Sequence, residues 1–148
     1  MKRTLALVFT CLFPVIAVAA DAVVSEDGPY ILPAGDNDLS EFLWIKRPVV
    51  VFADTPADPR YQQQIEMLTE RADEMIRRDV VVITDTDPQA RSPIRQRFRP
   101  RGFQLILLDK GGTIELRKPV PWDVRALSRS IDKMPLRQRE IREGKGLE

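Results

Sequence analysis

The residue types that carry most thiol and imidazole chemistry are almost missing from this chain. It has no histidine, and Cys11 is its single cysteine. One cysteine cannot form the dithiol of a disulfide oxidoreductase, and zinc sites built from cysteine and histidine lack their ligands. A serine–histidine catalytic arrangement is excluded as well. Several common enzyme classes are therefore excluded before any fold is considered.

The N-terminal segment has the pattern of a secretory signal peptide. A basic pair, Lys2 and Arg3, precedes an apolar stretch that ends in small residues at 17–20. A retained membrane anchor is one alternative, although the stretch is short for a membrane span. A lipid on Cys11 is another, although most of the apolar stretch lies after that residue. We predict a cleaved signal peptide over residues 1–20, no stable span after processing, and a periplasmic or secreted protein.

The chain also lacks a dominant charge. Its formal net charge is +1, and removal of the signal peptide, which holds two basic and no acidic residues, makes it −1. No global positive field then attracts nucleic acid, so no nucleic-acid partner is predicted. Roughly 128 residues remain, which is enough for one domain with its own hydrophobic core.

Hydrophobic periodicity predicts an α/β domain. Two continuous apolar runs, 49–53 and 80–84, are typical of strands buried on both faces, and an amphipathic helix beginning at Pro59 lies between them. Such a βαβ unit implies parallel strands joined by a right-handed crossover. The elements that follow are a short helix, a β-hairpin and a C-terminal helix, at 93–98, 103–117 and 124–131.

Composition also sets the expected domain boundaries. Residues 21–38 are rich in glycine, proline and aspartate, and they are predicted to form an irregular acidic arm. The domain itself is expected over 39–135, beginning with a short helix at 39–44. Residues 136–148 are predicted to form a charged, exposed tail that is partly helical.

The order of these elements resembles the thioredoxin-like core. Val49–Ala53 is similar to the central strand of that superfamily, which places its redox dithiol at the start of the next helix. The equivalent segment here, 55–60, has neither sulfur. Arg101–Leu105 is similar to the loop that carries a cis-proline in the superfamily, and Gln104 takes the place of that proline. The resemblance implies a mixed four-stranded sheet without the redox chemistry.

A closer resemblance is to the domain-of-unknown-function 4174 family, over about residues 39–142. It rests on three segments of the sequence: Phe42–Arg47, Leu108–Gly112 and Ile131–Arg137. The family occurs in bacterial exported proteins and as the C-terminal module of some animal sushi-repeat extracellular proteins. It has no assigned activity, so the resemblance implies a fold and not a reaction.

Four aspartates follow the two predicted parallel strands. Asp54 and Asp58 come after the first strand, and Asp85 and Asp87 after the second, so all four should lie at one edge of the sheet. Carboxylates there could hold a divalent cation or act as an acid–base pair. The competing interpretation is helix capping, since Asp58 and Asp87 each precede a proline. We take Asp54 and Asp85 as candidate binding residues, and predict no metal site and no cofactor.

Large aromatic side chains are expected in the core. Trp44, Phe103 and Trp122 could line a pocket, but their size and burial tendency favour core anchoring. Phe52 should be buried in the central sheet, with Leu68 packed on its face.

Arginine is concentrated between residues 91 and 101, where five arginines occur with no acidic residue. Ile94 and Phe98 should face the sheet, so Arg95 and Arg99 should point largely to solvent, with Arg101 beside them. This surface is either a solvated face, in contact with the chain's own acidic arm, or a contact for an acidic surface on another envelope protein. Arg95, Arg99 and Arg101 are therefore the candidate partner-binding residues.

Together these features predict an exported thioredoxin-like domain without redox cysteines. Its expected role is non-catalytic binding of a protein or another ligand. One alternative is a thiol-independent envelope enzyme that uses the aspartates. A structural or stress-protective role without a small ligand is the other. Convergence of the aspartates around an open cleft favours the enzyme, whereas two aspartates acting as helix caps favour the binding module.

Overall fold

A five-stranded mixed sheet organises the described part of the chain. The computed structural model describes residues 24–25 and 28–145, so the predicted signal peptide lies outside the described residues. Five strands form the sheet in the order β3-β5-β4-β6-β7, and β1 and β2 form a separate two-stranded pair. The strands are β1 (Val24–Ser25), β2 (Gly28–Pro29), β3 (Ile31–Pro33), β4 (Arg47–Phe52), β5 (Val80–Asp85), β6 (Gln104–Leu108) and β7 (Ile114–Lys118).

β4 lies at the centre of the sheet. It runs parallel to β5, with Val49 opposite Val82, and antiparallel to β6, with Val49 opposite Leu107. All six β4 residues are buried, and the apolar residues at 49–52 are typical of a strand that is covered on both faces. Three parallel strands followed by an antiparallel hairpin make the thioredoxin-like topology that the element order predicts.

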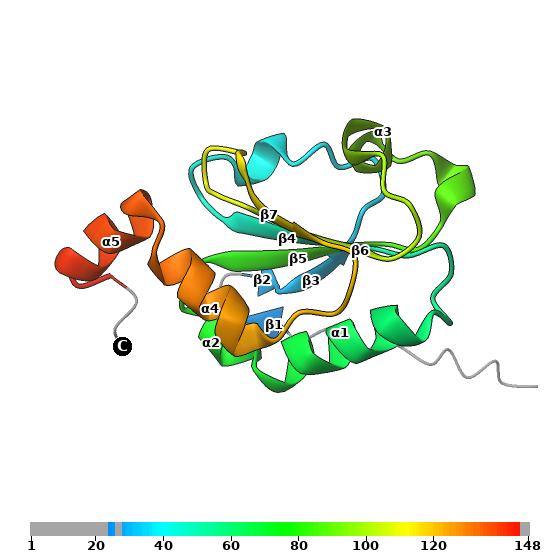
Figure 1. Ribbon diagram of the computed structural model, residues 1–148. Helices are drawn as coiled ribbons and strands as arrows, with labels where there is room; N and C mark the ends of the chain where they lie inside the picture. The colour runs from blue at the N-terminus through cyan, green and yellow to red at the C-terminus, as the bar shows by residue number, and fades with distance from the viewer. Residues whose placement is uncertain (1–23, 26–27, 146–148) are drawn as a thin grey trace, which may run out of the picture.

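Helices cover both faces of the sheet. The helical elements are η1 (Ser40–Phe42), α1 (Pro59–Glu70), α2 (Ala72–Ile76), η2 (Pro88–Ala90), α3 (Pro93–Phe98), α4 (Val124–Asp132) and α5 (Pro135–Arg142). Figure 1 shows α1, α2 and α4 on one face and α3 on the other. The cap predicted at Asp58 is present, and Ser92 and Asp123 cap α3 and α4 in the same way, since each side chain accepts a hydrogen bond from the first-turn backbone. The helix expected after Pro59 is interrupted at Arg71, where α1 ends and α2 begins.

Each face of the sheet has its own hydrophobic core. On the α1–α2–α4 face, Val49 and Leu105 pack with Leu68. On the α3 face, Phe52 packs with Phe98, with ring centroids 6.2 Å apart. The predicted burial of Phe52 and Leu68 is confirmed, because both side chains are fully buried.

The sheet has five strands, so the predicted count of four is wrong. The additional strand, β3, comes from the segment expected to be an irregular arm. Ile31 pairs in parallel with Val82, which extends the sheet beyond β5. β3 has only three residues and ends in Pro33, which is tolerated because an edge strand needs fewer ladder hydrogen bonds. Three residues are too few to show the apolar–polar alternation by which a strand is recognised in a sequence.

The C-terminal segment is helical, but it is not wholly exposed. α5 places Arg137 and Glu140 in buried positions, which contradicts the expectation of an exposed charged tail.

Among the described residues, no helix combines the length and apolarity needed to cross a bilayer.

Candidate functional site

The edge where a thioredoxin carries its dithiol holds charged residues that pair with one another. Asp58 accepts hydrogen bonds from the Arg60 backbone (2.9 Å) and from the Arg60 guanidinium (2.7 Å), which also lies over the Phe103 ring. The hydrogen bond from the Arg60 side chain lowers the pKa of Asp58 below its ordinary value. Gly102 adopts φ +64° beside Asp54 and Arg60, so the loop before β6 closes over this edge.

Asp85 is locked in place at the end of β5. Its buried carboxylate accepts hydrogen bonds from the Ser92 hydroxyl and from Arg95, whose Nε and Nη2 lie 3.0 and 2.8 Å from Oδ1. Arg95 Nη2 also donates to the Ala53 carbonyl at 2.8 Å. The contacts of Asp85 and Arg95 therefore join β4, β5 and the start of α3, and the carboxylate of Asp85 is already paired.

The prediction that Arg95 points to solvent is wrong. Its side chain is only 11% exposed, and its guanidinium lies 5.4 Å from the centre of the Phe52 ring. The Ser92 cap brings the first turn of α3 against Asp85, so the arginine three residues later meets the same carboxylate. The guanidinium therefore lies over the Phe52 ring while it pairs with Asp85. Arg99 and Arg101 are exposed as predicted.

The four aspartates do not form a shared ligand set. Asp58 caps α1 and Asp87 caps η2, while Asp85 pairs with Arg95. Asp54 is 62% exposed and lies 3.8 Å from Arg95 Nη1. Within residues 24–25 and 28–145, no group of three or more carboxylate, cysteine or histidine side chains is placed to hold a metal ion. This arrangement corresponds to the capping interpretation of Asp58 and Asp87.

A pocket lies at the opposite end of the sheet, between η1, the β6–β7 turn and α3. Its volume is about 260 Å³. Apolar lining comes from Leu39, Phe42, Leu43, Pro48 and Leu108, and polar lining from Asp38, Ser40, Lys46, Arg97, Asp109 and Lys110, with Gly111 and Gly112 of the turn. A Cβ added to Gly112 would lie 3.2 Å from Leu43, which shows how closely the turn approaches the η1 loop.

Backbone strain brackets this pocket. Leu39 and Trp44, on either side of η1, have φ of 73° and 64°. Such conformations cost roughly 1–3 kcal/mol each for residues other than glycine and persist only where neighbours impose them. Hydrogen bonds do so here: the Leu39 N–H donates to Asn37 (2.6 Å), and the Trp44 N–H donates to the Lys110 carbonyl (2.7 Å).

Trp44 is exposed, so its predicted core position is wrong. Its side chain is 73% exposed, and Leu43 and Ile45 beside it are exposed too. Its positive φ turns the loop outward and sets the indole against Gly111. Phe103 is buried as predicted, and Trp122 is half-buried, with the Lys118 ammonium 4.0 Å from its ring centre.

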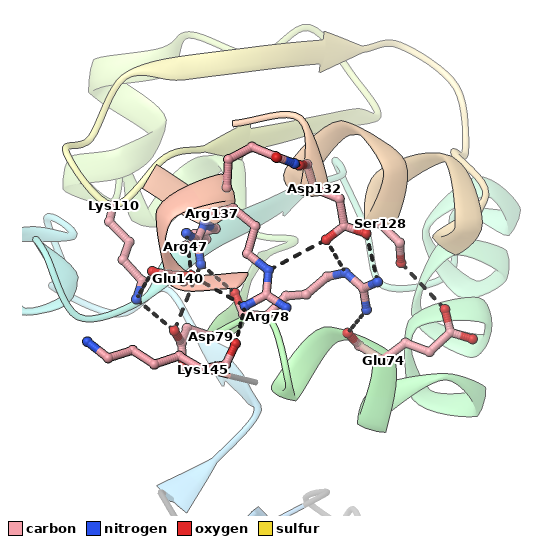
Figure 2. Close-up of polar contacts among 11 residues, drawn as sticks. Arg47, Glu74, Arg78, Asp79, Lys110, Ser128, Asp132, Arg137, Glu140 and Lys145 are labelled. Carbon is pink, nitrogen blue, oxygen red and sulfur yellow. Dashed lines mark hydrogen bonds and ion pairs between the residues drawn. The ribbon is translucent and has the colours of Figure 1, made fainter. Parts of the chain in front are cut away.

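A buried network of charges lies at the same end of the molecule (Figure 2). Arg47, the first residue of β4, is 1% exposed and its Nη2 lies 3.0 Å from Glu140. Lys110, from the β6–β7 turn, bridges Glu140 (2.8 Å) and Asp79 (2.6 Å). Arg137 extends the network along α5, with its Nη1 3.4 Å from Glu140. Burial alone would raise the pKa of Glu140, but Lys110 and Arg47 outweigh burial and hold the pKa below its ordinary value.

The three segments that carried the family resemblance meet at this end of the sheet. Phe42–Arg47 forms the η1 loop and the start of β4, Leu108–Gly112 forms the hairpin turn, and Ile131–Arg137 joins α4 to α5. The first two line the pocket, and Arg47, Lys110 and Arg137 join in the charge network. Sequence reasoning placed its candidate sites at the other end of the sheet, where β4 and β5 finish, and missed the pocket and the charge network.

A family comparison covers most of the chain, including both ends of the sheet. The model of "Domain of unknown function (DUF4174)" matches residues 38–140, over two thirds of the 148-residue chain. The chain belongs to the DUF4174 family. The DUF4174 match begins at Asp38 on the pocket rim and ends at Glu140 in the charge network, so it contains both features. A comparison of the DUF4174 chain with curated protein sequences found no match.

Solved structures similar to this DUF4174 domain include peroxiredoxins. Plasmodium yoelii thioredoxin peroxidase I is 16% identical, with a TM-score of 0.47 over 72% of this chain and 80% of that chain. Plasmodium yoelii Prx1a, modified at its N-terminus, is 16% identical, with a TM-score of 0.48 over 72% and 81%. The mitochondrial 2-Cys peroxiredoxin of Plasmodium falciparum is 16% identical, with a TM-score of 0.44 over 64% and 78%.

Proposed function

We propose that this DUF4174 domain is an exported, non-catalytic binding module that contacts an acidic surface of another envelope protein. The observation that carries the proposal is that charged side chains pair with one another at the end of the sheet where a thioredoxin would hold its redox dithiol. Asp58 pairs there with Arg60, and Asp85 with Arg95. These groups serve the fold, so the edge offers a surface for contact in place of a reaction centre.

Two exposed arginines at this edge support contact with an acidic partner. Arg99 is the C-cap residue that follows α3, Arg101 lies in the loop before β6, and both side chains are exposed. Arg117 reaches the same region, donating to the Phe98 carbonyl at 3.0 Å. Within the described residues, no carboxylate lies within 4 Å of Arg99 or Arg101. Arginine favours carboxylate partners because its planar guanidinium can donate two parallel hydrogen bonds.

The chain's own acidic arm is the competing partner for these arginines. The described part of that arm runs to Asp38, whose pKa is lowered by hydrogen bonds from Ser40 and, to a smaller extent, by the charge of Arg97. Asp38 lies on the rim of the pocket at the opposite end of the sheet from Arg101. Asp38 itself is therefore not the partner of Arg101.

Site-specific photo-crosslinking in the native cell envelope tests the proposal. A photo-reactive residue at position 101 is expected to capture a protein partner, and the double substitution Arg99→Ser with Arg117→Ser should remove that capture. The matched control is Arg125→Ser with Arg129→Ser, since both arginines are exposed on α4. Capture should also weaken as salt is raised, because exposed charge pairs are screened. Equal capture by wild-type and the Arg99 and Arg117 double variant would contradict the proposal.

A further inference from the structure

The pocket between η1 and the β6–β7 turn has the features of a ligand site, at the end of the sheet away from the proposed partner surface. Its volume of about 260 Å³ lies just below the range of drug-sized sites, so it suits a small ligand. Leu39, Phe42 and Leu108 form an apolar part of the pocket lining, and several polar side chains lie at its rim. Most small-molecule sites share this combination of an apolar lining and a few polar groups.

The charged groups on the rim are not equivalent. Asp109 accepts a hydrogen bond from the Thr113 backbone at 2.8 Å, and Asp38 accepts one from the Ser40 backbone at 2.9 Å, so both carboxylates serve the local turns. Arg97 is exposed and donates from Nη2 to the Gly112 carbonyl at 3.1 Å. A guanidinium has five donor hydrogens, so Arg97 keeps donors for a ligand. Its stacking on Phe98, at 4.8 Å from the ring centre, fixes where those donors lie.

From these observations we propose that the pocket binds a small amphipathic monocarboxylate. The apolar body of the ligand contacts Leu39, Phe42 and Leu108, and its carboxylate accepts hydrogen bonds from Arg97. A single negative charge is specified because Asp38 and Asp109 border the same pocket and offset most of the positive charge of Lys46, Arg97 and Lys110. The exposed indole of Trp44, which lies against Gly111 of the pocket wall, gives the ligand a further apolar surface.

The strained loop supports this assignment independently of charge. Leu39 and Trp44 hold left-handed backbone conformations at the two ends of η1, and Leu39 and its neighbours form one wall of the pocket. Strain of this kind is concentrated at ligand sites, where it fixes the shape of the wall before the ligand binds.

Fluorescence titration tests the proposal with defined probes. In a Trp122→Phe variant, Trp44 is the remaining tryptophan and reports on the pocket wall. Straight-chain carboxylates from hexanoate to decanoate are titrated beside the primary alcohols of equal length. We expect saturable binding of the carboxylates, with the alcohols about tenfold weaker because they lack the charge-assisted hydrogen bond. Amide NMR shifts should centre on Gly111 and Gly112.

Substitution of Arg97 separates the charge from the pocket. Arg97→Gln should weaken carboxylate binding about tenfold and leave alcohol binding within about twofold, whereas Arg97→Lys should retain most carboxylate affinity. Arg125→Gln, on the far face of the sheet, is the control and should change neither. The proposal is wrong if carboxylates and alcohols bind equally, or if Arg97→Gln has no effect. It is equally wrong if only anionic lipid vesicles change Trp44 fluorescence, because the loop would then be a membrane contact.

Discussion

At the scale of single residues, the Asp85–Arg95 pair connects a helix to two strands of the sheet. Arg95 reaches from α3 to the ends of both β4 and β5, through Ala53 and Asp85. Asp85 has a 3% exposed side chain, so loss of its partner would leave a carboxylate charge buried without a counter-ion. The pair therefore holds α3 against the sheet edge.

Arg95→Ala is expected to lower the free energy of unfolding by about 3–5 kcal/mol, the usual effect of breaking a buried ion pair from one side. Urea denaturation measures this change. Arg99→Ala is the control, since Arg99 is exposed and its loss should change stability by no more than about 0.5 kcal/mol. A loss for Arg95→Ala as small as that for Arg99→Ala would show that the contact between Arg95 and Asp85 is not formed in solution.

Phe52 provides a second test at this scale. Its ring is fully buried and contacts both Phe98 and the Arg95 guanidinium. Phe52→Ala should cost about 3–5 kcal/mol through lost burial and the cavity that remains. Trp44→Ala, which removes a larger but exposed aromatic ring, should change stability by no more than about 0.5 kcal/mol. A loss under about 1 kcal/mol for Phe52→Ala would contradict its place in the core.

At the scale of elements, α5 is attached to the domain chiefly through charge. Glu140 joins it to the first residue of β4 and to the β6–β7 turn, through Arg47 and Lys110. Arg137 ties its first turn back to Asp132 at the end of α4, at 3.5 Å. Removal of Glu140 would release α5 and leave Arg47 buried with one fewer acidic partner.

We expect Glu140→Ala to lower the free energy of unfolding by about 3–5 kcal/mol. Glu143→Ala is the matched control in the same segment. Glu143 pairs with Lys145 on the surface, with side chains 61% and 71% exposed, and such pairs contribute about 0–1 kcal/mol. Denaturant melts of the two variants give the comparison, and equal stability would show that α5 is held by other contacts.

The elements also show what sequence reasoning could reach. The caps at Asp58, Ser92 and Asp123 were predictable because their signals are local, and the buried runs of β4 and β5 were predictable from composition alone. The Arg47–Glu140 contact joins residues 93 positions apart, so no local pattern reports it. Trp44 was misplaced because its exposure follows from a positive φ, which a non-glycine residue rarely adopts.

At the scale of the whole molecule, the charge network makes stability depend on pH. The pKa of Glu140 is lower in the folded protein than its ordinary value of 4.5. Glu140 therefore contributes its full stabilisation above pH 4.5 and loses it as the pH falls through the lower folded-state pKa. Below that pH, its ion pairs with Arg47 and Lys110 no longer form.

Comparison with Glu140→Gln isolates this contribution. Wild-type protein should be more stable than the variant at neutral pH, and the difference should shrink as the pH is lowered from about 5 towards the folded-state pKa. Thermal melts of both proteins across this range measure the difference. A constant difference from neutral to acidic pH would show that Glu140 acts through packing and not through its charge.

The two edges of the sheet decide whether the protein resists aggregation. An unprotected edge strand can recruit a strand from another copy and begin an intermolecular sheet. β3 offers only three residues and ends in Pro33, which cannot donate to an added strand. β7 is longer, but Glu115, Arg117 and Lys118 place charges along it. In the part of the chain that the structure describes, neither edge strand of the five-stranded sheet therefore invites a strand from another copy.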